Sequence, residues 1–128
     1  MLIPGSRLIV RDGSGALAVR IFNMGPKKNW KHASIGHNTI CRGSVIKHEP
    51  HKKVTRGDKV HVMVLGCRKK ASRQNGCYIN FGKNKGILLS DKEKRKPLVQ
   101  RMKPDIAARE IKRDKKNANL MKVIINAL

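Results

Sequence analysis

Histidine and cysteine side chains occur at spacings that raise the question of a metal site. His48 and His51 are close in sequence, and Cys67 and Cys77 flank a basic segment. Structural zinc sites need closely paired ligands such as a C-x-x-C knuckle. Neither pair fits that pattern, and Glu49-Pro50 separates the two histidines. We therefore expect no metal ligands in this chain.

Carboxylates are scarce in the first 90 residues, where only Asp12, Glu49 and Asp58 occur, each beside an expected turn. Acid–base catalysis needs such groups gathered in a pocket that tunes the pKa of each. The segment Asp12–Gly15 lacks both the G-x-x-x-x-G-K of a P-loop and the G-x-S-x-G of a nucleophile elbow. It predicts a tight turn between paired strands. The sequence therefore indicates no catalytic residues, no cofactor and no enzyme.

Cations dominate the composition. The chain has 30 Lys plus Arg against 8 Asp plus Glu, which gives a formal net charge of +22. Self-repulsion on this scale opposes compaction of a small domain, so a permanent polyanionic partner is expected, most simply nucleic acid. No membrane partner is expected, because no apolar run approaches the ~20 residues of a spanning helix and the cations lie in loops rather than along one helix face.

The stretch from Lys59 to Ser90 concentrates the features that favour nucleic acid. Two apolar runs flank a basic arm whose far end is Asn75-Gly76, a dipeptide that favours a tight turn. No acidic residue occurs between Asp58 and Asp91. Each cation that meets a phosphate releases condensed counterions, so a hairpin with a cationic tip suits a polyanion. The cations of the arm are Arg68, Lys69, Lys70 and Arg73.

Alternation of apolar and polar residues predicts short strands through the first 90 residues. Leu17, Val19 and Ile21 should share one face of a strand that ends before Met24. Five or six such strands predict a small closed or nearly closed barrel. Apolar residues on both faces of Val60–Leu65 predict a strand that is covered on both sides. The other expected strands are Leu8–Val10, Thr39–Lys47, Cys77–Phe81 and Ile87–Leu89.

The core must be aliphatic, because only 3% of the residues are aromatic. The rings are Phe22, Trp30, Tyr78 and Phe81. Trp30 lies among lysines, where it could stack on a base or shield one edge of the core. The three cysteines are an odd set without a C-x-x-C pair, so we expect small apolar fillers in a reducing compartment rather than disulfides. They are Cys41, Cys67 and Cys77.

The composition changes after Ser90, where five of the eight acidic residues fall between Asp91 and Asp114. We interpret residues 1–128 as a single domain, with a barrel and arm in residues 1–90 and a connector with helices in residues 91–128. Pro97 should interrupt the charged connector, and Asp105–Arg113 has the order of charges of a helix. The apolar segment Leu120–Leu128 should dock on the barrel or on a neighbouring protein.

Mixed charges beside apolar residues suit a protein partner better than phosphate. We therefore expect the helix at Asp105–Arg113 to lie at or beside a protein contact. The alternative is that Glu110 only forms a pair within its own helix. The expected contact residues are Arg109, Glu110, Leu120 and Ile124.

Several motifs resemble, in order and spacing, the universal fourteenth protein of the large ribosomal subunit over nearly the whole chain. Val10–Ala16 is similar to the D-N-S-G-A turn of that family, and Val54–Val60 is similar to its V-K-K-G-D segment before a strand. The most specific match is to the signature R-R-x-D-G-x-x-x-x-F-x-x-N-x-x-V-L-L. It rests on Asn75-Gly76, Phe81, Asn84 and Gly86–Leu89, and weaker matches are Arg109–Ile111 to R-E-L and Met121–Ile124 to M-K-I-I.

The resemblance implies a mainly β fold, a small five-stranded β-barrel of the OB or SH3 type with a projecting β-ribbon and short C-terminal α-helices. It also implies a structural protein of the large subunit that binds its rRNA. Implied partners are the L-nineteen and L-three proteins, small-subunit rRNA across a bridge, and a ribosome-silencing factor. The RNA contacts are expected at Lys27, Lys28, Lys31, Lys47, Lys52, Lys53, Arg56, Arg68, Lys69, Lys70, Arg73, Lys83 and Lys85.

Departures from the family pattern bear on the compartment. Gly13 replaces the usual Asn, Gln74-Asn75 replaces Pro-Asp, and Lys112–Asn119 adds lysines. Such drift in an otherwise complete domain is what a mitochondrial member would show, with a bacterial or plastid ribosome as the alternative. A different class, a free single-strand-binding barrel that regulates RNA or DNA, would need several exposed aromatic residues on one sheet face. Four rings in all are too few for that function.

Overall fold

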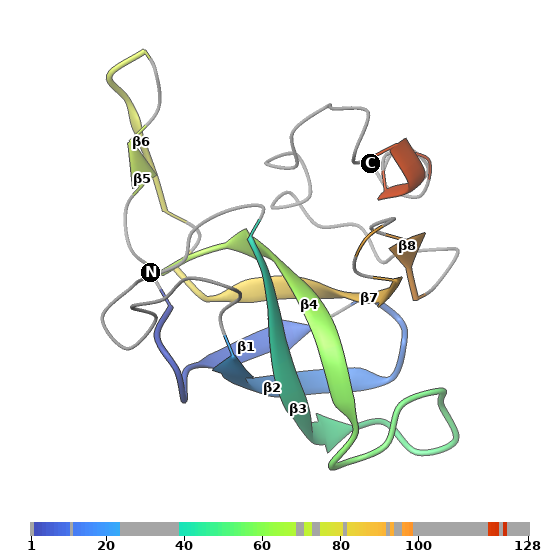
Figure 1. Ribbon diagram of the computed structural model, residues 1–128. Helices are drawn as coiled ribbons and strands as arrows, with labels where there is room; N and C mark the ends of the chain where they lie inside the picture. Colours follow the sequence, from blue (N-terminus) through green and yellow to red (C-terminus); the bar gives the residue numbers. More distant parts are fainter. Residues whose placement is uncertain are drawn as a thin grey trace.

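The computed structural model of the chain describes residues 2–10, 12–23, 39–68, 71–72, 75–80, 82–91, 93, 96–98, 118–120 and 122. Its main sheet has the strand order β1-β2-β3-β4-β7-β8, and a parallel pairing of β1 with β7 closes five of these strands into a barrel (Figure 1). The strands are β1 Arg7–Val10, β2 Ala16–Asn23, β3 Ile40–His48, β4 Lys59–Gly66, β7 Lys85–Asp91 and β8 Lys96–Pro97. This confirms the predicted five-stranded barrel.

The bounds of the predicted strands agree with those of the observed strands to within about two residues. The prediction that Leu17 shares the inward face of β2 with Val19 and Ile21 is wrong. Val19 and Ile21 point into the barrel, whereas Leu17 is 38% exposed. The pairing of β2 with β3 shifts register on either side of Ala18. A β-bulge of this kind leaves an extra residue unpaired and changes which way its side chain points. The bulge therefore turns Leu17 away from the core.

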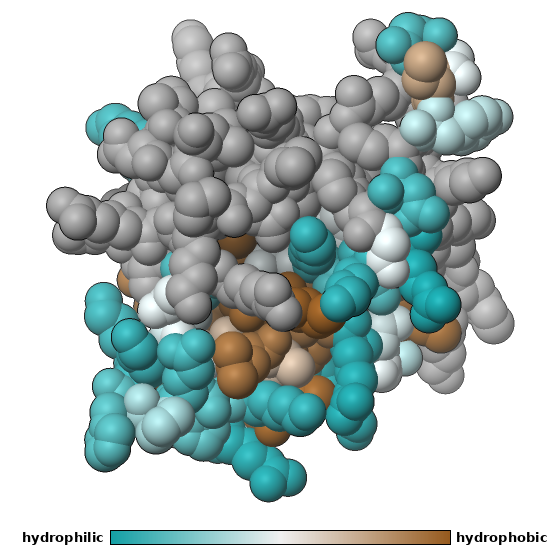
Figure 2. Space-filling view, turned by 180° about the vertical axis from the view of Figure 1, so that it is seen from behind, coloured by the Kyte–Doolittle hydropathy of each residue, from teal (hydrophilic) through white to brown (hydrophobic). Residues whose placement is uncertain are grey.

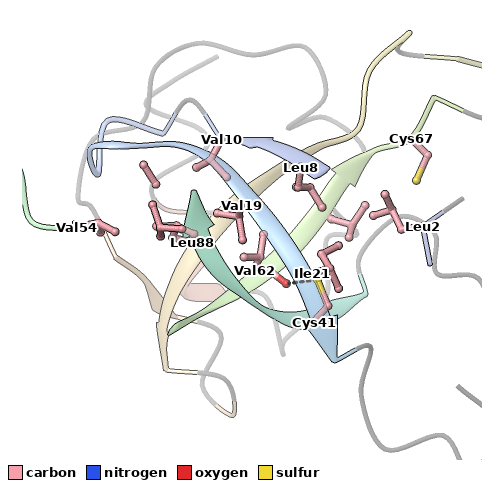
Figure 3. Packing of buried hydrophobic residues seen from close by; sticks show 13 residues of the cluster. Leu2, Leu8, Val10, Val19, Ile21, Cys41, Val54, Val62, Cys67 and Leu88 are labelled. Atoms are coloured by element: carbon pink, nitrogen blue, oxygen red, sulfur yellow. Dashed lines mark hydrogen bonds between the residues drawn. The ribbon is translucent and has the colours of Figure 1, made fainter. Parts of the chain in front are cut away.

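Aliphatic side chains fill the barrel, as the composition predicts. Leu8, Val19 and Leu88 are fully buried in one cluster. The cluster runs the length of the barrel, from Val54 at one end to Cys67 at the other (Figure 3). Burying such side chains is the main favourable contribution to folding, at about 1.5–3 kcal/mol for each large one.

Strands β4 and β7 are buried on both faces, which confirms the expectation for β4. Val62 and Val64 belong to the barrel cluster. Met63 and Leu65, on the opposite face of β4, are also buried. On β7, Ile87 and Leu89 pair with Met63 and His61 and are buried on the same outer face.

A buried carboxylate ties the β1–β2 turn to the strand that closes the barrel. Asp12 is 1% exposed. Its Oδ1 accepts hydrogen bonds from Ser14 N at 3.0 Å and Ser14 Oγ at 2.6 Å, and its Oδ2 accepts one from Leu88 N at 3.0 Å. The turn predicted at Asp12–Gly15 is therefore a structural clamp, since it satisfies three polar groups that would otherwise be buried without partners.

The arm is a two-stranded sheet of its own. Strand β5, Ala71–Ser72, pairs antiparallel with β6, Tyr78–Ile79, and the ribbon projects from one end of the barrel (Figure 1). At its tip Gly76 has φ 81°, and Asn75 Oδ1 accepts a hydrogen bond from Cys77 N at 3.1 Å. A residue without Cβ tolerates this left-handed backbone. The predicted ribbon and its turn are both present.

The C-terminal region differs from the expected connector. Lys96–Pro97 does not interrupt the fold but forms β8, which pairs with β7 at Leu89 and Asp91. Proline is tolerated there because an edge strand leaves one side of its backbone unpaired. Residues 118–120 and 122 are helical, and the predicted helix at 105–113 lies outside the described residues. Among the described residues, no helix is long and apolar enough to span a membrane.

Candidate nucleic-acid interface

The end of β3 and the loop that joins it to β4 present four exposed cations from a hydrogen-bonded frame. Val54 is buried at the end of the barrel core and anchors the loop (Figure 3). Val45 N donates to Asp58 O at 2.9 Å, Gly57 N donates to Val45 O at 2.8 Å, and Asp58 Oδ2 accepts from Thr55 N at 3.0 Å. Because the backbone is held in this way, the cations are presented from a fixed platform. They are Lys47, Lys52, Lys53 and Arg56.

The loop is also tied to the β1–β2 turn. Glu49 N donates to Gly15 O at 2.7 Å. Gly15 has φ 101°, and a Cβ at this position would collide with the side chain of Lys52. Gly15 therefore allows Lys52 to pack across the turn, which positions its stem while the residue remains exposed.

A second group of cations lies at the base of the arm. Arg68 and Lys83 are exposed, and Lys85 is half-buried in β7. Asn84 holds these segments together, because its Oδ1 accepts from Arg68 N at 3.0 Å and its backbone carbonyl accepts from Ile9 N at 2.9 Å. Cys67, next to Arg68, is buried in the barrel core and fixes the start of the arm. The resemblance pointed to Asn84 only as part of a motif, and the structure gives it this positioning role.

The two groups lie at opposite ends of β4, which is eight residues long (Figure 1). At about 3.3 Å per residue, the strand separates them by roughly 25 Å. We call them the loop site (Lys47, Lys52, Lys53, Arg56) and the arm-base site (Arg68, Lys83, Lys85). The loop site is adjacent to Val54 and the arm-base site to Cys67, which are buried at the two ends of the core. The barrel therefore lies between two cationic surfaces.

Several predicted residues lie outside the described part of the chain, and their interactions stay predictions. Trp30 is among them, so both interpretations of that ring remain open. Leu120 is described and is fully buried within the chain, so it has no surface to offer another protein. The others are Lys27, Lys28, Lys31, Lys69, Lys70, Arg73, Arg109, Glu110 and Ile124.

The structure adds exposed cations that the sequence prediction missed. Arg7, Arg20 and Arg42 point outward from β1, β2 and β3, and Arg7 is directly opposite Arg20. The alternation of β2 already placed Arg20 on the outer face, which is the signal that could have found it. Two described rings are also at the surface, with Phe22 41% and Tyr78 70% exposed.

The cysteines have different environments. Cys41 and Cys67 are buried fillers as predicted, but Cys77 is exposed on the arm, where the chain has left the barrel core. Burial raises the pKa of the Cys41 thiol from 9.0 to about 12, because desolvation disfavours the thiolate. Its Sγ donates to Val62 O at 3.6 Å (Figure 3). No group of three or more His, Cys, Asp or Glu residues that could hold a metal occurs among the described residues.

The fold and its surface define a small basic β-barrel protein with a projecting ribbon. Comparison with known protein families matches residues 1–127 to the family described as ribosomal protein L14p/L23e. The match covers nearly the whole chain, so the chain belongs to this family. It is thus a structural protein of the large ribosomal subunit.

Proposed function

We propose that this protein binds large-subunit rRNA through the loop site, the arm-base site and the cations of the arm, and so clamps RNA segments on either side of the barrel. The observation that carries the proposal is the pair of cationic groups, exposed except for the half-buried Lys85, each held by a hydrogen-bonded backbone at one end of β4. Fixed cations bind phosphate with less loss of conformational freedom than cations on mobile loops. Ordered loops therefore favour recognition of a folded RNA surface.

A clamp on folded RNA agrees with the placement of the exposed rings better than a free single-strand binder does. Phe22 lies on β2 of the barrel, and Tyr78 lies on β6 of the arm. A stacking platform needs neighbouring rings on one sheet face so that successive bases can stack. The two described exposed rings belong to different sheets, so they do not form such a platform.

The proposed position is the subunit-interface side of the large subunit, beside the L-nineteen and L-three proteins. There the protein would contribute a bridge to small-subunit rRNA and offer a contact to a silencing factor. We propose a mitochondrial ribosome, on the basis of the departures at Gly13, Gln74-Asn75 and Lys112–Asn119. The rRNA that co-sediments with the protein on a sucrose gradient identifies the compartment, and bacterial or plastid rRNA there would exclude a mitochondrial one.

The protein contact is proposed at Arg109, Glu110 and Ile124, where mixed charges flank apolar residues. Leu120 is not part of this proposal, because it is buried within the chain. Arg109→Glu with Glu110→Arg should remove a protein neighbour that cross-links to this segment in assembled subunits. If the segment cross-links only to rRNA and the double variant keeps every protein neighbour, the contact is with RNA.

Salt dependence of binding tests the RNA-binding proposal. Replacing Lys52, Lys53 and Arg56 by Gln should flatten the plot of log affinity against log salt by up to about 0.9 per lost phosphate contact with a duplex. Two further variants should flatten the slope in the same way. One replaces Arg68 and Lys83 by Gln, and the other replaces Lys69, Lys70 and Arg73 by Gln. The probe is a fragment of the cognate rRNA.

The matched control replaces two exposed cations outside these groups, Lys96 and Lys122, by Gln. These changes also remove positive charge, but they should leave the slope within about one contact of the parent value. Equal slopes for the parent and the loop-site and arm variants would show that these cations do not contact phosphate.

A further inference from the structure

An apolar patch lies on the outer face of the barrel, between the loop site and the arm-base site. We define it as Ile9, Leu17, Ala18 and Ile46. Along β1 and β3, residues 8, 10 and 45 are buried in the core, so Ile9 and Ile46 point outward and are partly exposed. Figure 2 shows an apolar surface on the side of the molecule that faces away in Figure 1, with hydrophilic residues below it and beside it. This surface is unexpected on a chain with 30 cations.

The β-bulges of β2 and β3 assemble this patch. Ile9 pairs directly with Ala18, and Ala18 pairs with Lys47. The register shifts leave Leu17 and Ile46 as the extra residues on either side of Ala18. Without the shift, the alternation of β2 would turn Leu17 inward with Val19. Bulges often re-aim a side chain for a function, and here the bulges bring apolar side chains to one outer surface.

Cations surround the apolar patch. Arg7 and Arg20 are exposed and lie directly opposite each other on β1 and β2, next to the Ile9–Ala18 pair. Like charges directly opposite one another on a sheet are destabilising. Arg42 and Lys47, which are also exposed, lie at the two ends of β3. An anionic group placed against this rim would relieve the repulsion between Arg7 and Arg20.

Three kinds of partner can be compared on these observations. Phosphate would neutralise the arginines but gains nothing from contact with Leu17 or Ile46. A second copy of the chain would bring two cationic rims together, which is unfavourable. A protein segment that carries both apolar side chains and carboxylates satisfies the apolar patch and its rim together, because buried apolar area supplies affinity and opposite charges fix the register.

We propose that the apolar patch is a docking surface for an acidic, amphipathic segment of another protein of the assembled subunit. Apolar side chains of that segment cover Leu17, Ala18 and Ile46, and a carboxylate pairs with Arg7 and Arg20. This face borders the loop site at Lys47 and the arm-base site at Lys85, but its apolar side chains belong to neither. The same molecule can therefore hold RNA at the two ends of β4 and a protein on the outside of β1–β3.

Photo-cross-linking in purified, assembled large subunits tests the proposal. A benzophenone side chain at position 17 should cross-link to one ribosomal protein, at a peptide that contains apolar residues and Asp or Glu. The control places the same group at position 96, an exposed residue on β8, and should not cross-link to that peptide. A cross-link from position 17 to rRNA, to a second copy of this chain or to nothing would overturn the proposal.

Two sets of variants separate the apolar from the charged contribution. Leu17→Ser with Ile46→Ser should lower retention of the cross-linked protein in salt-washed subunits by about tenfold or more, since two apolar contacts are lost. Tyr78→Ser, which changes an exposed ring on the arm, should not. Arg20→Glu should lower retention as well, and a Lys in place of the partner's cross-linked carboxylate should restore it. Full retention in every variant would overturn the proposal.

Failure of this proposal is distinguishable from failure of rRNA binding. The apolar variants should leave the salt dependence of rRNA binding unchanged, because no cation is altered. The loop-site and arm variants should change that dependence while the protein cross-link at position 17 persists.

Discussion

The barrel and the arm are built on opposite principles. Each of the five barrel strands is paired with two other strands of the barrel, and aliphatic side chains are buried along the whole length of the barrel. The arm has two register pairs, belongs to a separate sheet and exposes Asn75, Cys77 and Tyr78 to solvent. Packing therefore specifies the barrel, whereas turn chemistry specifies the arm. Changes in the arm can alter binding with little effect on the stability of the barrel.

Among substitutions that distinguish the barrel from the arm, Asp12→Ala should cause the largest loss of stability. Asp12→Ala removes the acceptor of three hydrogen bonds and leaves Leu88 N buried without this partner. We expect the free energy of unfolding to fall by about 3–4 kcal/mol, since bonds to a charged acceptor and an orphaned buried donor both contribute. Urea unfolding in sulfate buffer, where anions offset the self-repulsion of the chain, measures this loss.

The control for Asp12 is Asp58→Ala. Asp58 is exposed, and among the described residues its carboxylate accepts one hydrogen bond, from Thr55 N. Its loss should cost about 1 kcal/mol or less. If both substitutions destabilise equally, the clamp between the β1–β2 turn and β7 is not what closes the barrel.

A smaller effect is expected at Gly86, which faces the barrel interior. A Cβ there would collide with the side chains of Leu8 and Val62 and approach Met63 O. Gly86→Ala should lower the free energy of unfolding by about 1–3 kcal/mol, because an overpacked core must shift its neighbours. Thermal unfolding followed by circular dichroism measures the change. An unchanged free energy of unfolding would mean that the side chains of Leu8 and Val62 move aside without cost, which contradicts a closely packed barrel core.

Much of the barrel could be predicted from the sequence, because its strands and turns follow from preferences of residues close together in the chain. Alternation of apolar residues located strands such as β3 and β4 to within about a residue. The turn at Asn75-Gly76 followed from the tolerance of these residues for unusual backbone angles. In both cases short-range preferences and the final structure agree, so a short segment of sequence was enough.

What the sequence could not provide depends on pairing between distant segments. The exposed position of Leu17 results from a register shift against β3. The burial of Asp12 depends on β7, 76 residues away. Pro97 is predicted to interrupt the connector but lies in the edge strand β8. For the binding residues, the charge pattern identified the loop and arm, but the anchoring by Val54, Cys67 and Asn84 required the closed barrel.

Burial of Cys41 predicts a dependence of stability on pH. The pKa of its thiol is about 12 in the folded protein, against 9.0 as the ordinary value. Above about pH 9 the unfolded chain loses this proton while the folded protein keeps it. The free energy of unfolding should therefore fall as the pH rises, by up to ~1.4 kcal/mol per pH unit until about pH 12.

Comparison of the pH slopes of the parent and Cys41→Ala isolates this contribution, because the other titrating groups are common to both. The parent should lose stability more steeply above about pH 9. Alkylation provides a second measurement, in which Cys77 on the exposed arm should react with iodoacetamide at pH 8 while Cys41 stays protected. Parallel slopes would show that solvent reaches the thiol in the folded barrel.

The smallest effect on overall stability is expected at the tip of the arm. Gly76 has φ 81°, and a Cβ there would meet no other atom. Gly76→Ala therefore strains the turn, by about 1 kcal/mol, without touching the core. Because the arm forms its own sheet, this strain should appear as faster hydrogen exchange at the amides of Cys77 and Tyr78 and not at those of β4. The barrel should unfold within about 0.5 kcal/mol of the parent.

Measurements of rRNA binding also distinguish turn strain in the arm from loss of charge. Gly76→Ala keeps every cation, so the salt slope of rRNA binding should be unchanged. The affinity should fall by no more than about fivefold, which is the fraction lost when ~1 kcal/mol of turn strain must be overcome to hold the arm in its bound shape. Charge removal in the arm should do the reverse and change the slope while exchange at the tip stays the same. If Gly76→Ala lowers the unfolding midpoint of the barrel, the two regions fold as one unit and the separation between packing and turn chemistry does not hold.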